Sequence, residues 1–488
     1  MTSSRVVRVG TDDDAVVAGL RAGIERIQAE LDVTPDFPDE VEQAAARAAA
    51  SPRLPDLDRT DLPLVTIDPP GARDLDQALH LERDPDRPGG FVVHYAIADV
   101  AAFVTPGDPV DLEAHRRGQT LYGADSKVPL HPPSLSEDAA SLLPDQVRPA
   151  LLWTIRVDET GEGIDVDVRR ARVRSTAQLT YEQAQARVEA DDAPESLVLL
   201  RELGELRLAR EAARGGISLP LPEQEVVVDE RPGTPWRLEF RSQLPVEQWN
   251  AQVSLLTGFG AASLMVYARV GLLRTLPPPD PRDVQRLHRT ARALGVEWPA
   301  ELLYPDFLRT LDPARPEHAA LLVASARLLR GSGYVAFDGE VPADPQHSAL
   351  ASEYAHVTAP LRRLADRYAG EVCVALCADE PVPGWVLEAL PGLPAEMQRS
   401  SQQAGAYERA VVDLVEAGLL AGRVGEEFDG VVASTDGDDD RKGRVTVREV
   451  GVEAPLRSDD GPLPLGQDVR VRLTEADVET RVVRFEMA

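Results

Sequence analysis

Cysteine, aromatic residues, uninterrupted apolar runs and basic charge are all scarce in this chain of 488 residues. Its two cysteines, Cys373 and Cys377, are too few for a disulfide framework or for a zinc site built mainly from thiolates. Their spacing of four residues predicts two small buried side chains on one face of a helix. Aromatic residues make up only 5 % of the chain, so a surface that stacks on nucleic-acid bases would have few rings.

Long apolar runs are also lacking. The longest, such as residues 410–420, contain Asp413 and Glu416, so we expect no transmembrane helix. The first eleven residues contain no apolar core of the kind found in signal peptides, and the sequence therefore predicts a cytoplasmic protein.

Basic residues are outnumbered by acidic ones. The chain has 52 lysines and arginines against 82 aspartates and glutamates, a formal charge of −30. Phosphate binding depends on cationic side chains, so this balance at first argues against a nucleic-acid ligand. Net charge describes solubility and long-range steering rather than one channel, however, and only local charge can decide the question.

The pattern of apolar and polar residues changes along the chain and predicts a fold of the α+β class that is divided into several parts. Residues 1–58 are expected to form a small helical region, because 12–31 and 38–50 have helical periodicity. A large α+β domain is expected over 59–383. Its short β runs lie at 64–67, 90–100, 151–158 and 167–174. Its helical patterns lie at 181–190, 195–214, 246–271, 282–295, 316–330 and 360–377.

The last hundred residues divide into two further parts. Residues 384–422 are expected to be a helical connection. Residues 423–488 contain short alternating strands broken by Gly, Asp and Pro, a pattern typical of a five-stranded OB-like barrel.

The most informative stretch is VTIDPPGARDLDQALHL at 65–81. A β run ends at Asp68, two prolines turn the chain, and Asp74 and Asp76 follow. Carboxylates close together on a bent loop can bind a hard cation such as Mg²⁺, which prefers oxygen ligands. On spacing alone, such a pair beside Gly and Pro is more often an ordinary solvated turn. An EF-hand calcium loop is disfavoured, because its glycine and terminal glutamate are not in place.

Two further stretches give this motif a context. HYAIADVAAFVT at 94–105 continues into a Pro-rich segment up to residue 151, and YAHVTAPLRRLADRYAGEVC lies far downstream at 354–373. Together with TIDPPGARDLDQA, these stretches resemble the catalytic-domain signature of the ribonuclease II (RNB) family of exoribonucleases. The resemblance covers residues 60–383, and the final segment resembles, more weakly, an S1-type OB barrel. The helical N-terminal region departs from the family, in which small RNA-binding barrels would be expected there.

The resemblance implies an RNB-type catalytic domain with a buried channel. It also implies magnesium-dependent hydrolysis of single-stranded RNA, proceeding processively from the 3′ end and releasing nucleoside 5′-monophosphates. Mn²⁺ is an alternative metal. A monomer is expected, with protein partners unknown.

The same resemblance assigns roles to individual residues. Asp68, Asp74, Asp76 and Gln77 match the metal-binding positions, with Asp76 also catalytic. Gln77 stands where the family has an acid, which removes one negative charge from the cluster. Arg362 matches a catalytic arginine that stabilises charge on the phosphate in the transition state.

Several other residues are expected to contact RNA. Tyr181 would stack on a base, Glu247 would accept a hydrogen bond from a ribose hydroxyl, and Tyr122 would be a ring at the channel mouth. Arg363 would contact a neighbouring phosphate. In the terminal barrel a basic groove would be formed by Arg441, Lys442, Arg444, Arg448 and Arg472. Acidic residues are interleaved with them, so an ordinary solvated surface is the alternative.

Three functions of different classes follow from these features. The first is a hydrolytic 3′→5′ exoribonuclease. The second is a catalytically impaired RNA-binding relative, damaged at Gln77. The third, which needs no resemblance, is a metal-dependent phosphodiesterase acting on another ester.

Overall fold

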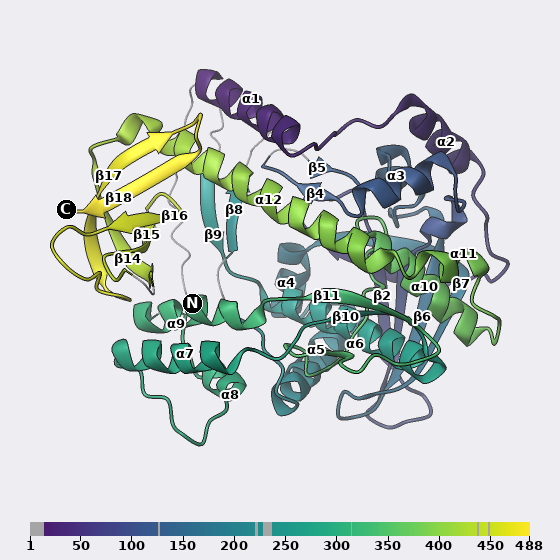
Figure 1. The fold of residues 1–488 in the computed structure, drawn as a ribbon. Coiled ribbons are helices and arrows are strands. Elements are labelled where there is room, and N and C mark those ends of the chain that lie inside the picture. The colour runs from purple at the N-terminus through teal and green to yellow at the C-terminus, as the bar shows by residue number, and fades with distance from the viewer. Residues whose placement is uncertain are drawn as a thin grey trace.

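The computed structural model describes residues 14–488, except 125–126, 220–222, 228–236, 314, 437–438 and 448. Two closed β-barrels lie in this part of the chain, and helices pack around and between them (Figure 1). The larger, central part carries the first barrel, and the second barrel is formed by the C-terminal strands.

The first barrel has the strand order β1-β2-β3-β6-β7. Its strands are β1 (Leu64–Asp68), β2 (Gln77–Arg83), β3 (Phe91–Ala98), β6 (Val147–Val157) and β7 (Gly163–Thr180). The barrel closes where β1 runs parallel to β7, with Asp68 opposite Thr180. The sequence predicted four of these strands but neither β2 nor the closure, because β2 follows directly on the acidic residues 68–76 and its apolar residues alternate imperfectly.

Helices cover this barrel and fill its core. α6 (Pro245–Ala268) and α10 (Leu364–Cys377) pack against β7, and their apolar side chains join those of the barrel in one cluster around the fully buried Trp153. Cys373 is buried and Cys377 half-buried, both as free thiols. By length and composition alone α6 could cross a membrane, and 44 % of its apolar window is buried inside the protein; a single helix of this kind is weak evidence for a membrane span.

The remaining elements are further helices, single turns and two-stranded sheets. The helices are α3 (Pro109–Arg117), α4 (Tyr181–Glu189), α5 (Glu195–Ala213), α7 (Pro281–Ala293), α8 (Tyr304–Arg309), α9 (Pro316–Ser325) and α11 (Gly384–Ala389). Single turns are η1 (Val100–Ala102), η2 (Leu135–Ala139), η3 (Ala326–Leu329) and η4 (Ala421–Arg423). Two-stranded sheets pair β4 (Leu121–Tyr122) with β5 (Lys127–Val128), β8 (Glu223–Val227) with β9 (Arg237–Arg241), β10 (Val270–Thr275) with β11 (Gly333–Asp338), and β12 (Gln346–His347) with β13 (Ser352–Glu353).

The second barrel confirms the predicted five-stranded C-terminal barrel. Its order is β14-β15-β16-β18-β17. The strands are β14 (Glu427–Thr435), β15 (Lys442–Val447), β16 (Val452–Arg457), β17 (Asp468–Asp477) and β18 (Val482–Met487).

A long helix, α12 (Leu393–Leu420), links the central part to this barrel (Figure 1). The first two helices are α1 (Asp14–Glu30) and α2 (Asp39–Ala50), and α1 lies along α12. Two glycines allow this approach, because a Cβ on Gly23 would lie 2.6 Å from Leu414 and one on Gly418 would lie 2.6 Å from Leu20. The apolar side chains of α1, α12 and the second barrel form one continuous cluster.

Candidate active site

The acidic loop, residues 68–77, joins β1 to β2 and is fixed at several points. Gln178 on β7 donates from Nε2 to the carbonyl of Ala72 at 2.7 Å. Ser141 accepts from the backbone N–H of Leu75 at 3.0 Å and donates to the carbonyl of Arg73 at 2.5 Å. The loop therefore presents its carboxylates from a backbone held by other segments of the domain.

Asp76 is the most buried of the three carboxylates, with 5 % of its surface exposed. Its Oδ1 accepts from the backbone N–H of Leu361 at 2.8 Å, and its Oδ2 lies 3.5 Å from Nε of Arg362. Burial raises the pKa of Asp76 to about 8, although Arg362 opposes the rise. The side chain thus lies in a position where its negative charge is poorly compensated by the protein.

Asp68 and Asp74 complete the predicted acidic set. Burial raises the pKa of Asp68 to about 6, and the charge of Asp74 adds to that rise. Oδ2 of Asp68 is buried without a hydrogen-bond partner among the described residues. Asp74 forms an ion pair with Nζ of Lys127 at 2.7 Å, and Lys127 also lies 3.0 Å from Glu137.

These donors fit a hard cation by their chemistry, because all are carboxylate oxygens, one oxygen of Asp68 is buried without a partner among the described residues, and burial raises the pKa of Asp68 and Asp76. As the side chains stand, no three His, Cys, Asp or Glu residues of the described chain form a compact group that could hold a metal ion. Lys127 is the cation that contacts Asp74 instead.

The arginine loop, residues 354–363, brings Arg362 to the acidic loop from far along the chain. Its backbone is fixed by the carbonyl of Arg362, which accepts from Thr120 N–H at 3.0 Å, and by the N–H of Ala359, which donates to Asp366 at 2.7 Å. The Arg362 side chain is 42 % exposed and beside the buried Asp76. Its guanidinium can therefore reach a ligand while remaining next to the carboxylate.

Arg363 has a different environment from its neighbour. It donates from Nε and Nη2 to the two oxygens of Asp366, both at 2.9 Å, and Asp366 is itself buried. This bidentate ion pair holds the start of α10, so the predicted phosphate contact of Arg363 would have to use its remaining nitrogen.

Gln77 has both ends of its amide in contact with protein. Nε2 donates to the carbonyl of Thr358 at 2.7 Å, and Oε1 accepts from the hydroxyl of Tyr95. The predicted role of Gln77 as a metal ligand would use the same Oε1 atom.

The two predicted channel tyrosines lie beside the carboxylates. Tyr181 begins α4 directly after Thr180, the residue opposite Asp68, and burial together with the charge of Asp68 raises its pKa to about 12. The ring of Tyr122 is exposed, but desolvation raises the pKa of its hydroxyl, on which the charges of Arg362 and Asp74 also act.

Glu247 caps the beginning of α6. It accepts from Arg241 at 2.7 and 2.9 Å and from the backbone N–H of Leu244 at 2.8 Å. These three bonds already occupy the carboxylate that was predicted to accept from a ribose hydroxyl.

Sequence reasoning missed Lys127 and Tyr95 as neighbours of the acidic loop. A signal for Lys127 was present, because the chain has only two lysines, Lys127 and Lys442, among its 52 basic residues. Tyr95 lies in a strand that is buried along its whole length and gave no such signal.

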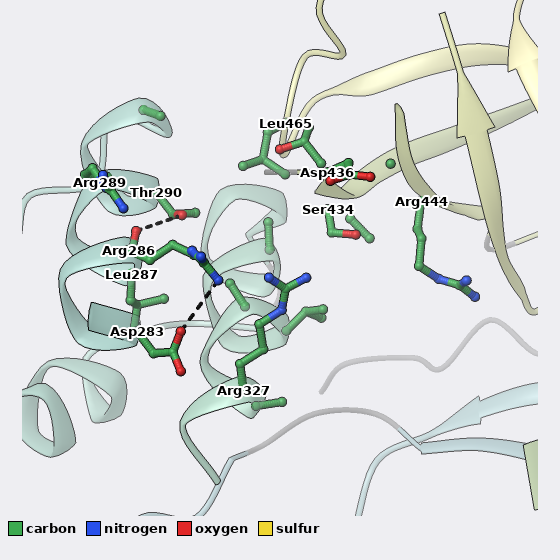
Figure 2. Close-up of a pocket in the computed structure, with 18 of the residues that line it drawn as sticks. Asp283, Arg286, Leu287, Arg289, Thr290, Arg327, Ser434, Asp436, Arg444 and Leu465 are labelled. Carbon is green, nitrogen blue, oxygen red and sulfur yellow. Dashed lines mark hydrogen bonds and ion pairs between the residues drawn. The ribbon is translucent and has the colours of Figure 1, made fainter. Parts of the chain in front are cut away.

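A second candidate binding region, the basic cleft, lies between the helices α7 and η3 and the second barrel (Figure 2). The cavity measures about 1140 Å³, and Arg286 and Arg327 point into the space between the helices and the barrel. Its basic lining residues are Arg286, Arg289, Arg327, Arg330, Lys442 and Arg444.

Half of these cations have an ion-pair partner among the described residues. Arg286 pairs with Asp283 at 3.5 Å, Lys442 with Asp439 at 3.0 Å and Arg444 with Glu453 at 2.8 Å. Within the described part of the chain, Arg289, Arg327 and Arg330 have no ion-pair partner, although the protein as a whole is strongly acidic.

The barrel residues predicted to bind RNA divide accordingly. Lys442 and Arg444 line the basic cleft. Arg441 is exposed at the turn before β15, and Arg472 pairs with Glu427 at 2.8 Å. Arg448 lies outside the described residues.

Comparison with known proteins gives two family matches. Residues 57–376 match the RNB domain, and residues 426–488 match the RNase II-type exonuclease C-terminal S1 domain. The predicted fold class, α+β with an RNB-type domain and a C-terminal S1 barrel, is thereby confirmed.

Individual relatives agree with these matches. The chain is 29 % identical to ribonuclease R of Aquifex aeolicus over 75 % of this chain and 53 % of that protein. The structure of Mycoplasma genitalium RNase R in complex with ribose-methylated single-stranded RNA superposes with a TM-score of 0.84 at 20 % identity, covering 96 % of this chain and 78 % of that one. Yeast Ssd1, a pseudonuclease, matches at 16 % identity with a TM-score of 0.69, over 93 % of this chain and 57 % of Ssd1. The chain spans between a third and about half of the length of the first curated relatives it matches.

Proposed function

Because the chain belongs to the RNB family of ribonucleases, we propose that it is a metal-dependent 3′→5′ exoribonuclease that degrades single-stranded RNA to nucleoside 5′-monophosphates. The observation that carries the proposal is the contact of Asp76 with Leu361 and Arg362, which lie 285 or more positions further along the chain. Two further carboxylates lie beside this contact. A buried acid next to an accessible arginine is suited to a phosphodiester, whose transition state gains negative charge.

Asp68, Asp74 and Asp76 are the residues that would hold Mg²⁺ or Mn²⁺. A bound divalent ion would supply charge stabilisation on the phosphate and a more acidic water. The chain contributes a loop whose backbone is fixed at Ala72 and Leu75, so the carboxylates would converge on the ion by side-chain rotation, with Asp74 turning away from Lys127.

Arg362 would donate to the phosphate or to the leaving 3′ oxygen. Its position depends on Asp76 and on the backbone bond to Thr120. Tyr181 and Tyr122, next to the same carboxylates, would hold the last nucleotides by stacking.

We further propose that RNA follows the basic cleft before it reaches this site. Arg289, Arg327 and Arg330, for which the described residues include no ion-pair partner, provide the local positive charge that the whole-chain composition lacks. In this proposal the enzyme works in the cytoplasm as a monomer.

The second candidate is a catalytically impaired RNA-binding relative. Two observations favour it: the amide at position 77, and the fold shared with the pseudonuclease Ssd1. The intact set of Asp68, Asp74, Asp76 and Arg362 favours the active enzyme instead.

One assay separates the candidates. The purified protein is incubated with 5′-labelled oligoribonucleotide and Mg²⁺ or Mn²⁺, with chelator as control. Mononucleotides and a ladder shortened from the 3′ end support the exoribonuclease. A gel shift without products supports the impaired relative, and hydrolysis of small diesters with RNA intact would overturn both.

A further inference from the structure

Gln77 lies next to Asp76 at the end of the acidic loop, and its amide bridges two distant segments. Nε2 donates to the carbonyl of Thr358 in the arginine loop at 2.7 Å, and Oε1 accepts from Tyr95 on β3. Asp76 bonds to Leu361 in the same arginine loop at 2.8 Å. Two consecutive residues thus join the acidic loop to the arginine loop.

The bridge requires an amide. The carbonyl of Thr358 needs a donor, and a carboxylate at position 77 would present only acceptors to it. Tyr95 is fully buried, which raises its pKa and keeps its hydroxyl protonated as a donor to Oε1. Each partner of Gln77 therefore has the polarity that matches one end of the amide.

Further bonds extend this bridge into the surrounding helices. The side chain of Thr358 forms a hydrogen bond with Ser254 on α6 at 2.8 Å. One residue along, the N–H of Ala359 donates to Asp366 on α10. The arginine loop is thus held from three sides, and Gln77 supplies the contact on the side of the carboxylates.

We propose that Gln77 is a positioning residue, which holds the arginine loop against the acidic loop so that Arg362 stays beside Asp76, and that it is not a metal ligand. This inference rests on the proposed function, since the two loops are taken to carry the catalytic groups. It also explains how the chain can lack an acid at position 77 without losing its activity: the residue fixes geometry in place of contributing charge.

The test uses Gln77→Met, which keeps the length of the side chain but removes both hydrogen bonds. Tyr95→Phe removes the donor to Oε1 together with the contact of the same hydroxyl with Ser254, and it touches no carboxylate. Gln403→Met is the matched control, because the amide of Gln403 also donates to a carbonyl, that of Leu31 at 2.9 Å, far from the acidic loop. Circular dichroism melts establish that each variant is folded.

Three quantities are measured on the full chain. These are the dissociation constant for Mn²⁺ by calorimetry, single-turnover cleavage of a labelled oligoribonucleotide, and hydrogen–deuterium exchange of peptides covering the arginine loop. We expect Gln77→Met to bind Mn²⁺ within about twofold of wild type, to cleave about 10-fold or more slowly, and to exchange faster in the arginine loop. Tyr95→Phe should change cleavage in the same direction and by less, and the double variant should be no slower than Gln77→Met, because both changes break the same bridge.

The outcomes distinguish this inference from the proposed function. Weaker Mn²⁺ binding by Gln77→Met, with unchanged exchange in the arginine loop, would mean that Gln77 is a ligand and would overturn the inference. If wild type cleaves no RNA, the proposed function fails, while the exchange and Mn²⁺ measurements still decide the role of Gln77. Cleavage by Gln77→Met at the rate of Gln403→Met would also overturn the inference that Gln77 is a positioning residue.

Discussion

Asp76 is the residue on which the proposed chemistry depends most directly, because it contacts both the arginine loop and Arg362. Asp76→Asn keeps the shape and can still accept from Leu361 N–H, so folding and RNA binding should survive. Loss of the negative charge should slow cleavage by about 100-fold or more, the scale of one lost electrostatic stabiliser. Asp459→Asn, an exposed change on the second barrel, is the matched control. Cleavage by Asp76→Asn within a few-fold of that control would contradict the assignment.

The raised pKa of Asp76 also predicts how stability depends on pH without metal. Between the ordinary value of 3.8 and about 8, the folded protein keeps a proton that the unfolded chain releases. The stabilisation is complete below the pKa of the unfolded chain and is lost as the pH rises through the pKa of Asp76 in the folded protein. In chelator, the melting temperature of wild type should therefore fall relative to Asp76→Asn from pH 6 to pH 8, by roughly 2 °C or more.

Metal should reverse this loss, since an ion bound by ionised carboxylates stabilises the native state. Thermal melts with and without millimolar Mg²⁺ at both pH values measure the effect, which should be larger at pH 8. A difference between wild type and Asp76→Asn that does not change with pH would show that Asp76 is not the titrating group.

Among the helices, α10 is fixed by a buried ion pair to α3. Arg367 is 2 % exposed in its side chain and bonds to Asp111, which is 6 % exposed. Because α10 begins directly after Arg363, this pair also anchors the end of the arginine loop.

Arg367→Met should destabilise the protein by about 3–5 kcal/mol, because the buried Asp111 would lose its guanidinium partner and keep the N–H of Gly107 and, at 4.0 Å, His115. Urea unfolding measures the change. Arg83→Met, which breaks an exposed ion pair with Glu202, is the control and should cost less than about 1 kcal/mol. Adding Asp111→Asn to Arg367→Met should recover part of the loss. If Arg367→Met and Arg83→Met destabilised the protein equally, burial would not be the reason that the ion pair of Arg367 with Asp111 is important.

The sequence predicted the elements better than their assembly. Helices such as α6 and α10 follow from local periodicity, and the acidic loop stood out because three carboxylates lie within nine residues beside two prolines. The bridge at Gln77 could not be predicted in this way, because Tyr95 and Thr358 lie 18 and 281 residues away. Closure of the first barrel likewise depends on a long-range pairing of β1 with β7.

For the whole molecule, the second barrel is more than an attached module. Its apolar core is continuous with α12 and α1, and Glu30 of α1 pairs with Arg481 of the barrel at 2.7 Å. Truncation before Arg423 would expose the buried face of α12, so loss of RNA binding in such a fragment would also reflect damage to the fold. Surface substitutions in the basic cleft test the role of the barrel more directly.

The double change Arg289→Gln and Arg327→Gln removes two unpaired cations from the helical side of the basic cleft while keeping polar side chains of similar size. If RNA crosses this cleft, its affinity for a long oligoribonucleotide should fall several-fold. The plot of log affinity against log salt should also become shallower, by about 0.7 for each lost phosphate contact. Cleavage of very short oligomers should change less, because the cleft lining contains no residue of the acidic loop or the arginine loop. Arg457→Gln, an exposed change on the barrel outside the cleft lining, is the control. An unchanged salt slope in the double variant would mean that RNA reaches the carboxylates by another path.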